Sequence, residues 1–574
     1  MSFEAQRRIY DRADPRFDFI LRSGRTVSPS DWAFARGILE ENESLTQHHE
    51  NALQILKENH RTISSLFAPI RKVPPEVLSY IFAHFIGKNR FGPTEKDWES
   101  NASKLGGVCS YWRSVSLTTP RLWAKLEVII DFSVSFDAFV LQDLKRHIER
   151  ANHALDLTLT LEDEDDSEND NVIESLFLPS GEWRSLCLTV GVGCEQTAIT
   201  ILHNHLAEKL KLQSLELDLE NATSDEGRVI LNAFVSRSSL LRQIHLPASD
   251  SYLEPDNLGL YVPLLSRLTH LFIDNTTETI LSLLEHCSGL VFAHFVVPSS
   301  RDADDSSERD DNDQNDNGTS RKMHRMLHLQ DLAIEVPSTG IKGVKYPLQG
   351  AAQILQVITC PELQSLSLIS DAGTNQSVSG PKKKISLLRS LHDFLERSQT
   401  LLLRLRVECI PFSDEEIISL LRTTPSLTQL TILETPRRGY PDEESHPESM
   451  YLLPRLRDLR IAIEWELNDD KFVDLVKSRL IESQPPFVPN PLSRLQSFYL
   501  KALNGDGGPE HVWFAETLRE LKKERDLAVR FVSFKTIFQT QKGRRISKKV
   551  ESVKIGHGED DDHSDSEDSF HDFY

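Results

Sequence analysis

The stretch Leu212-Gln-Ser-Leu215-Glu-Leu217 is the clearest copy of a pattern that recurs along the chain: an apolar residue, two spacers, an apolar residue, one spacer and a last apolar residue. Another clear copy is Leu268-Thr-His-Leu271-Phe-Ile273. Because successive side chains of a strand point to opposite faces, the alternation that ends each copy predicts a short strand with one buried face. The eleven copies begin at residues 183, 212, 241, 268, 290, 329, 363, 402, 427, 456 and 495.

The segments between the copies have the apolar period of amphipathic helices. They include residues 226–238, 277–287, 384–398 and 413–424, and the last begins with Ser413 and Glu416 in the spacing of a capping box. A strand and a helix repeated every 25–30 residues is the pattern of leucine-rich repeats, and the chain resembles an irregular protein of that kind over this span. An ordinary α/β domain with leucine-rich strands is the alternative.

In a leucine-rich-repeat array the spacer residues lie on a solvent-facing concave sheet, which suits recognition of a protein surface. The resemblance therefore makes the polar spacers candidates for binding a target protein. The candidate target-binding residues are Gln213, Arg242, His270, Gln330, Gln364, Arg404, Gln429 and Arg457.

The net charge of −22 is concentrated in three short tracts. Residues 162–170, 301–317 and 559–574 together carry −21, so the rest of the chain is close to neutral. Blocks of like charge bury little and repel themselves, so we interpret the first two tracts as loop insertions and the third as part of a disordered tail. The acidic balance argues against a nucleic-acid partner, which requires a basic surface.

Apolar runs and cysteines give a first indication of location. The longest apolar runs are shorter than the 18 residues that a transmembrane helix needs, and the first residues have no signal-peptide core. The six cysteines are scattered and predict neither a disulfide framework nor a zinc site, so we expect a reducing compartment, cytoplasmic or nuclear. The basic segment 542–549 is a candidate nuclear-import signal.

The segment ahead of the repeats, residues 68–126, contains two motifs. The first is Val73-Pro-Pro-Glu-Val-Leu-Ser-Tyr-Ile-Phe82, and the second is Val108-Cys-Ser-Tyr-Trp-Arg113. They resemble the F-box, and Thr119-Pro-Arg-Leu-Trp123 is similar to the stretch that follows F-boxes of the fungal type. The departures are Val73, where leucine is usual, and the long polar stretch 89–103 between the two predicted helices.

The F-box resemblance implies that this segment binds the Skp adaptor of a cullin-based ubiquitin ligase. The adaptor-facing residues that it implies are Pro74, Leu78, Ile81, Phe82, Val108, Cys109 and Trp112. Trp112 or Phe82 packing inside the segment instead is the alternative.

The predicted fold class is α/β: an N-terminal all-α F-box followed by an irregular leucine-rich-repeat solenoid with a strand and a helix per repeat. The predicted organisation is a flexible arm at 1–29, a helix with partial heptads at 30–67, the F-box at 68–126, repeats at 127–535 with the two acidic insertions, and a basic then acidic disordered tail at 536–574.

Signatures of catalysis and of metal or cofactor binding are missing from the sequence. His203 and His205 follow Cys187 and Cys194, but this spacing is not that of a zinc site. We therefore expect a non-enzymatic protein without a cofactor or metal. The resemblance implies a substrate-recognition subunit of a Skp–cullin–F-box (SCF) ubiquitin ligase, whose partners are the Skp adaptor, through it the cullin, and an unknown target protein, with no membrane partner. The alternatives are an F-box scaffold outside any ligase and a repeat protein that inhibits another protein.

Overall fold

The computed structural model divides the chain into two compact units, Met1–Phe85 and Ile86–Tyr574. It describes residues 19, 22, 26–94, 98–152, 154–162, 170–219, 222–247, 253–297, 323–337, 348–370, 381–410, 412–433, 453–463, 497–502 and 528–534. Most of the arm at 1–29, nearly all of both acidic insertions and the whole tail at 536–574 lie outside these residues, and so does the basic segment 542–549.

The first unit is helical. Helix α3 (Pro29–Leu66) is followed by the 3₁₀ turn η1 (Pro69–Lys72) and helix α4 (Pro75–Phe85). The Ser28 side chain caps α3 by accepting a hydrogen bond from the Asp31 backbone nitrogen at 3.2 Å, and Pro29 occupies the first helical position. The predicted helix at 30–67 is therefore present, and none of its described side chains is buried.

In the residues that the structure describes, the second unit is a mixed α/β structure built on a parallel sheet of 15 strands. Neighbouring strands follow chain order, because each new strand adds beside the previous one, except that β9 (His324–Arg325) and β11 (Ile358–Thr359) form a separate pair. The strands of the large sheet are β1 (Asn89–Phe91), β2 (Lys125–Asp131), β3 (Asp156–Glu162), β4 (Ser185–Val190), β5 (Ser214–Asp218), β6 (Gln243–Leu246), β7 (His270–Asp274), β8 (Phe292–Val296), β10 (Asp331–Val336), β12 (Ser365–Ser370), β13 (Arg404–Glu408), β14 (Gln429–Leu433), β15 (Asp458–Ile463), β16 (Ser497–Ala502) and β17 (Ala528–Phe534).

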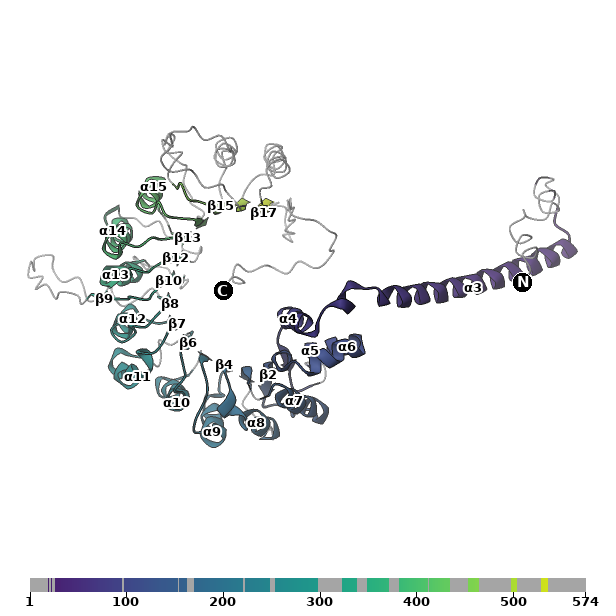
Figure 1. The fold of residues 1–574 in the computed structure, drawn as a ribbon, viewed down its shortest axis with the longest axis horizontal. Helices are drawn as coiled ribbons and strands as arrows, with labels where there is room; N and C mark the ends of the chain where they lie inside the picture. The colour runs from purple at the N-terminus through teal and green to yellow at the C-terminus, as the bar shows by residue number, and fades with distance from the viewer. Residues whose placement is uncertain are drawn as a thin grey trace, which may run out of the picture. The chain divides into compact units, whose positions relative to one another are not determined.

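Helices of the second unit cover one face of this sheet, which we call the outer face; the other is the inner face (Figure 1). The helices and 3₁₀ turns are α5 (Asn101–Val108), α6 (Ser110–Leu117), η3 (Pro120–Leu122), α7 (Ala138–Arg150), α8 (Asp170–Phe177), η4 (Ser180–Glu182), α9 (Glu195–His205), α10 (Ser224–Val235), η6 (Pro255–Tyr261), α11 (Val262–Leu265), α12 (Thr277–Leu284), α13 (Gln349–Val357), α14 (Pro381–Ser398) and α15 (Asp414–Thr423).

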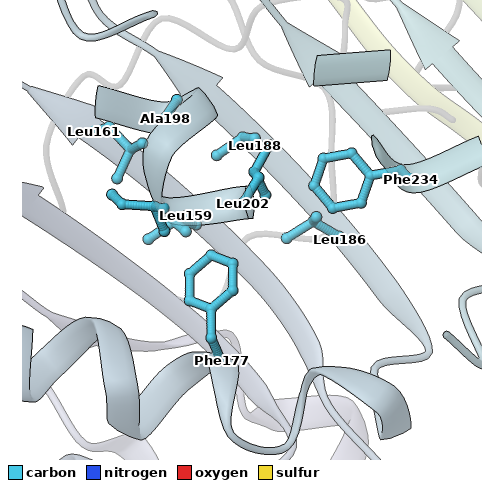
Figure 2. Close-up of a pocket in the computed structure, with 9 residues that line it drawn as sticks. Leu159, Leu161, Phe177, Leu186, Leu188, Ala198, Leu202 and Phe234 are labelled. Carbon is cyan, nitrogen blue, oxygen red and sulfur yellow. The ribbon is translucent and has the colours of Figure 1, made fainter. Parts of the chain in front are cut away.

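The hydrophobic core lies between the outer face and these helices. On β5, Leu215 and Leu217 are fully buried and alternate with half-buried Ser214, Glu216 and Asp218. Figure 2 shows the same arrangement around an apolar pocket between β3, β4 and helices α8–α10. The pocket is lined by Leu159, Leu161, Phe177, Leu186, Leu188, Ala198, Ile201, Leu202 and Phe234. Burying a leucine side chain contributes about 1.5–3 kcal/mol, so this layer supplies most of the driving force for folding.

All eleven copies of the sequence pattern form strands, β4 to β8, β10 and β12 to β16, which confirms the strand predictions. The four predicted helices are also confirmed as α10, α12, α14 and α15, and the capping box of Ser413 and Glu416 is present. Strands β2 and β3 extend the series before the first recognised copy. Trp123-Ala-Lys-Leu126-Glu-Val128 fits the same pattern and could have located β2.

The segment 68–126 differs from the all-helical expectation in three ways. Strand β1 lies within its polar stretch and pairs with β2, so this stretch is the first strand of the sheet. Arg90 forms an antiparallel bridge with Glu99, whose backbone bonds both measure 2.9 Å. In addition, the boundary between the two units falls after Phe85, which places α4 in the first unit and α5 and α6 in the second.

The predicted second helix of this segment is interrupted at Cys109. This residue has extended backbone angles (φ −161°, ψ 169°), ends α5 and caps α6. Its sulfur accepts a hydrogen bond from the Trp112 backbone nitrogen at 3.5 Å. Gly106 and Gly107 come just before the break, and glycine is a weak helix former, which accounts for the interruption.

In the described part of the chain, no helix combines the length and the apolar character needed to cross a membrane.

Candidate protein-binding surfaces

The inner face of the sheet is organised in rows, because the strands pair in a regular parallel register. One row runs from Cys187 through Glu216, His245, Phe272 and His294 on strands β4 to β8. These are the single spacers between the last two apolar residues of each copy, and in a strand they point away from the buried leucines. In each row of the inner face, every strand therefore contributes one side chain.

Aromatic rings form a continuous group in the middle of this face. The rings of His245 and Phe272 meet edge to face at 3.8 Å between centroids, and those of Phe272 and His294 at 4.4 Å. In the adjacent row the rings of His270 and Phe292 are stacked, 5.9 Å apart with an interplanar angle of 24°. We call these five residues the aromatic patch.

Carboxylates hold the two ends of the patch. Glu216 Oε1 lies 3.0 Å from His245 Nδ1, and Glu335 Oε2 lies 3.2 Å from His294 Nε2. The hydrogen bond with His245 lowers the pKa of the Glu216 carboxyl, which therefore stays ionised at neutral pH. Burial lowers the pKa of His270, so its imidazole is uncharged there.

Cys187, at the β4 end of the row, is not a reactive thiol. Burial, reinforced by the nearby Glu216 carboxylate, raises its pKa to about 12. Since the thiolate is the nucleophilic form, this cysteine stays protonated and unreactive at neutral pH.

The predicted target-binding residues fall into two groups. His270, Arg404 and Gln429 are the first residues of β7, β13 and β14 and lie on the inner face. The other five each come one residue before a strand, where their backbones extend the parallel ladder: Gln213, Arg242, Gln330, Gln364 and Arg457.

The second group therefore lies at the amino edge of the sheet and not on its inner face. For example, the Gln364 backbone nitrogen donates to the Gln330 oxygen at 2.8 Å, before β10 and β12 begin. Because successive side chains of a strand alternate, the two spacers of each copy have opposite orientations, and the predicted set contains residues from both positions. Glu216, His245, Phe272 and His294, which lie on the inner face by the same alternation, are not in the predicted set.

The predicted adaptor-facing residues of the first unit differ in exposure. Pro74 comes just before α4 and Ile81 is 43% exposed, whereas Leu78 and Phe82 are 0% and 2% exposed. The structure thus places Leu78 and Phe82 inside the protein and not on its surface. Helix α4 instead exposes the apolar residues Val77, Tyr80, Ile81 and Phe85.

The remaining adaptor-facing candidates lie in the second unit, at the junction of α5 and α6. Val108 ends α5 and is 60% exposed, Cys109 caps α6 and is half-buried, and Trp112 is also half-buried on α6. Val115 of α6 is buried, while Leu117 at the end of the helix is exposed. The junction therefore offers apolar side chains to solvent.

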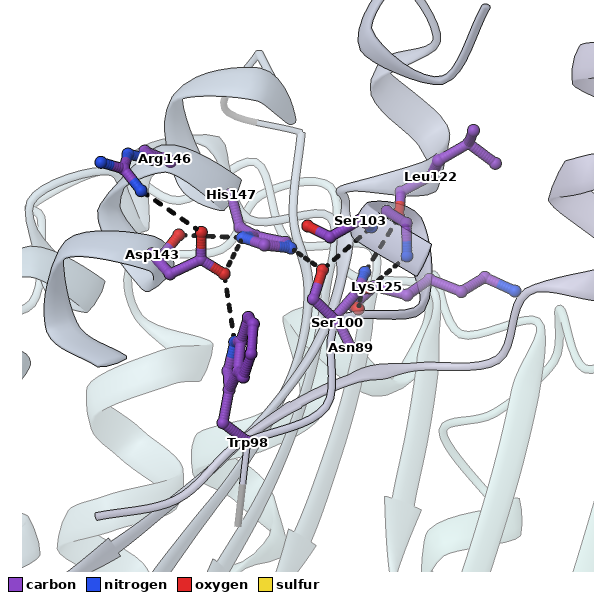
Figure 3. A network of polar contacts seen from close by, with 10 residues as sticks. Asn89, Trp98, Ser100, Ser103, Leu122, Lys125, Asp143, Arg146 and His147 are labelled. Atoms are coloured by element: carbon purple, nitrogen blue, oxygen red, sulfur yellow. Dashed lines mark hydrogen bonds and ion pairs between the residues drawn. The ribbon is translucent and has the colours of Figure 1, made fainter. Parts of the chain in front are cut away.

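A buried polar network at the first end of the sheet includes a serine, a histidine and an aspartate (Figure 3). His147 Nδ1 lies 2.8 Å from the Asp143 carbonyl oxygen and donates to it, so its Nε2 accepts from the Ser100 hydroxyl, also at 2.8 Å. Burial lowers the pKa of His147, which favours this neutral form. The Asp143 carboxylate accepts from Trp98 Nε1 at 3.1 Å.

The Ser100–His147 pair resembles a nucleophile and its base, but its surroundings indicate a structural role. Ser100 is 3% exposed and His147 is 0% exposed, so a substrate has no access to them. Ser100 is also the N-cap of α5, because its hydroxyl accepts from the Ser103 backbone nitrogen at 3.1 Å. The network joins α5 to α7 on the outer layer.

Asn89 attaches the same helix to the strands. Its Nδ2 donates to the carbonyl oxygens of Leu122 at 2.9 Å and Lys125 at 3.3 Å, and its Oδ1 accepts from the Ala102 nitrogen at 3.1 Å. The side chain is fully buried, so these bonds fix α5 relative to β1 and β2.

Among the described residues, no group of three or more histidine, cysteine, aspartate or glutamate side chains is arranged to hold a metal ion. His203 and His205 are exposed on α9, and Cys194 is buried.

Comparisons with known proteins give little further information. No protein-family model and no curated protein matches the chain. Among solved structures, the chain is similar to one in the crystal structure of the Rad7 and Elc1 complex in yeast, with 14% identity over 78% of this chain and 92% of the other. The TM-score is 0.32, and at this level the similarity supports no inference about function.

Proposed function

We propose that this chain is the substrate-recognition subunit of an SCF-type ubiquitin ligase. The segment 73–113 would bind the Skp adaptor and, through it, the cullin, while the sheet, as an irregular leucine-rich-repeat solenoid, would bind a target protein. The observation that carries the proposal is the match of Val73–Phe82 and Val108–Arg113 to the F-box pattern.

The exposed face of α4 supports this proposal. Val77, Tyr80, Ile81 and Phe85 are 50%, 63%, 43% and 81% exposed on a helix of 11 residues. Large apolar side chains gathered on one short helix indicate an interaction site, and aromatic residues commonly carry most of the binding energy. Tyr80 is held in place by edge-to-face contact with His84 at 4.4 Å.

The chain would act by proximity and would make or break no covalent bond itself. A receptor that holds its target beside a ubiquitin-charged enzyme raises the effective concentration of one for the other. Such a protein needs two separate binding surfaces and no cofactor, and we propose that it works in the cytoplasm or nucleus.

Co-purification with the Skp adaptor tests the proposal. We expect the full chain to recover the adaptor and Ile81→Glu to reduce recovery at least about tenfold, because a charge in a central hot spot costs more than about 1.4 kcal/mol. Val192→Glu is the matched control, since Val192 is 74% exposed in the second unit, outside the F-box-like segment. Failure of the unmodified chain to recover the adaptor would contradict the proposal.

The same material separates the ligase from the two alternatives. If the complex contains cullin and ubiquitinates a bound protein in vitro, the chain is a ligase subunit. Recovery of the adaptor without cullin would favour an F-box scaffold outside any ligase. Binding of a partner by the sheet without the adaptor would favour an inhibitor.

A further inference from the structure

Helix α3 is long, and its apolar side chains are open to solvent. None of its described side chains is buried. The large apolar residues that are more than half exposed include Leu39, Leu53, Ile55, Leu56 and Ile63. Helices of folded proteins owe most of their stability to the packing of an apolar face. So much exposed apolar surface on a helix of 38 residues therefore indicates an interface.

The residues along one face of α3 follow the spacing of a coiled coil. Eight positions from Ile38 to Ile63 are separated by alternating steps of four and three residues, which is the spacing of the a and d positions of a heptad. The a positions are Asn42, His49, Leu56 and Ile63, and the d positions are Ile38, Leu45, Ala52 and Asn59. This face therefore has the pattern that packs against a second helix of the same kind.

A second copy of α3 in antiparallel orientation matches this face layer by layer. Each a position of one copy then faces a d position of the other. In one register the layers pair Ile38 with Ile63, Asn42 with Asn59, Leu45 with Leu56 and His49 with Ala52. Apolar residues meet apolar residues, and the two asparagine amides, each with a donor and an acceptor, can bond to one another.

A parallel pair fits less well, because each residue would face its own copy. The layer at His49 would hold two large rings, and the layer at Ala52 only two methyl groups. The antiparallel register places the large side chain opposite the small one in both layers. Even packing of this kind is what a well-filled interface requires.

The charges of α3 favour the same orientation. Residues 29–47 carry four carboxylates and one arginine, whereas residues 51–66 carry one carboxylate, one lysine and one arginine. A parallel pair would bring the two acidic halves together, while an antiparallel pair places each acidic half beside the other half of the second copy. Glu50 lies near its own counterpart in both orientations and favours neither.

The contact is large enough for a dimer. In the antiparallel register the two helices overlap over residues 35–66, a length of about 48 Å. A strip as wide as a helix, about 10–12 Å, then covers about 500 Å² on each copy. The total of about 1,000 Å² reaches the size that a specific protein interface needs.

We propose that the chain forms a dimer through an antiparallel pair of α3 helices, in which Asn42 of each copy faces Asn59 of the other. The inference goes beyond the proposed function, because the partner is a second copy of this chain and the contact needs no adaptor. A buried asparagine pair fixes the register, since any shift leaves amides opposite apolar side chains.

Sedimentation velocity of the full chain over a range of concentrations tests the dimer. We expect a particle of twice 65.4 kDa. Leu56→Glu should weaken dimerisation at least about tenfold, because it places an unpaired charge in the seam. Leu56 is 64% exposed in the single chain, so the variant should fold normally, as circular dichroism can check.

Asn51→Glu is the matched control for Leu56→Glu. It adds the same charge to an exposed position of α3 outside the a and d series, and it should leave the dissociation constant within about twofold. A monomeric unmodified chain overturns the inference, and so does a dimer that Leu56→Glu leaves intact.

Cysteine cross-linking tests the orientation. One chain carries Asn42→Cys and the other Asn59→Cys, with tags of different size, and the unmodified chain gives the background from its own cysteines. Under mild oxidation we expect a disulfide-linked pair of unlike chains from the mixture and no link above background from either variant alone. Linking of either variant alone shows a parallel pair and overturns the inference, as does the absence of any link in the mixture.

Skp adaptor recovery with the same preparations keeps the two proposals apart. Leu56→Glu should recover the adaptor as well as the unmodified chain does, because Leu56 lies outside the segment 73–113. A monomeric chain that recovers the adaptor would refute only the dimer. A dimer that recovers no adaptor would refute only the ligase proposal.

Discussion

The outer and inner faces of the sheet are built by the same strands but carry different side chains. On β5 the outer residues Leu215 and Leu217 are fully buried, whereas the inner residues Ser214, Glu216 and Asp218 remain partly exposed. The outer residues repeat almost unchanged from strand to strand, because each must fill the same space beneath a helix. The inner residues vary, so positions that stabilise the fold alternate along one sequence with positions that are free to differ.

The largest effect that this comparison predicts is on stability. Leu217→Ala should lower the free energy of unfolding by about 2–5 kcal/mol, because it leaves a cavity in the outer layer. Thr189→Ala, on the inner face of the adjacent strand β4, should change it by less than about 0.5 kcal/mol. Urea unfolding followed by circular dichroism measures both. Similar losses from the two variants would contradict the conclusion that outer-face residues stabilise the fold more than inner-face residues.

A smaller loss should come from the buried polar groups at the first end of the sheet. Asn89→Ala removes three hydrogen bonds and leaves their backbone partners buried, so we expect a loss of about 1–3 kcal/mol. Asn101→Ala is the matched control, since this side chain makes one exposed bond to the Lys88 oxygen at 3.1 Å. Equal stability of the two variants would mean that the Asn89 bonds do not hold α5 to the strands.

Helix caps in the outer layer should contribute less to the free energy of unfolding than these buried polar groups. Ser413→Ala removes one half of the capping box of α15 and should cost about 1 kcal/mol, in the range 0.5–2. Ser282→Ala serves as the comparison, because Ser282 lies inside α12 and its exposed hydroxyl bonds only to the Glu278 oxygen. Thermal unfolding of the two variants would show whether the position at the cap, and not the loss of a hydroxyl, accounts for the effect.

The smallest predicted effect concerns pH and belongs to the inner face. The folded-state pKa of Glu216 is lowered, so its contribution to stability is present above the unfolded pKa of about 4.3 and is lost as pH falls through the folded value. Glu216→Gln should therefore narrow the difference in melting temperature between neutral and acidic pH. Glu174→Gln, an exposed change on α8, should leave that difference as it is in the unmodified chain.

The outer face could be predicted from the sequence because every strand needs apolar side chains at the same positions to pack beneath the helices. Eleven strands were located from the leucine pattern alone, whereas β2 was not, although Trp123, Leu126 and Val128 fit the same pattern. The acidic tract 301–317 lengthens the interval between the copies at 290 and 329, but it follows β8 and leaves the pattern residues of both copies in place.

The candidate site was harder to predict for two physical reasons. The exact first residue of each strand decides which spacer faces inward, and Gln213 and Arg242 each come one residue before their strand begins. On α4 the apolar residues alone did not show which are buried, so Leu78 and Phe82 were expected on the surface beside Ile81. In both cases a difference of one position in a periodic element changes which side chains a partner can reach.

The short strand β1 has a consequence for how molecules of this protein behave toward one another. A free edge of a sheet presents unpaired backbone groups that can capture a strand from another chain, which is a common route to aggregation. Here the terminal strand has only three residues, and the backbone nitrogen and oxygen of Arg90 are both bonded to Glu99. The chain thus blocks this edge with its own backbone, and the sheet does not offer it as a template for growth.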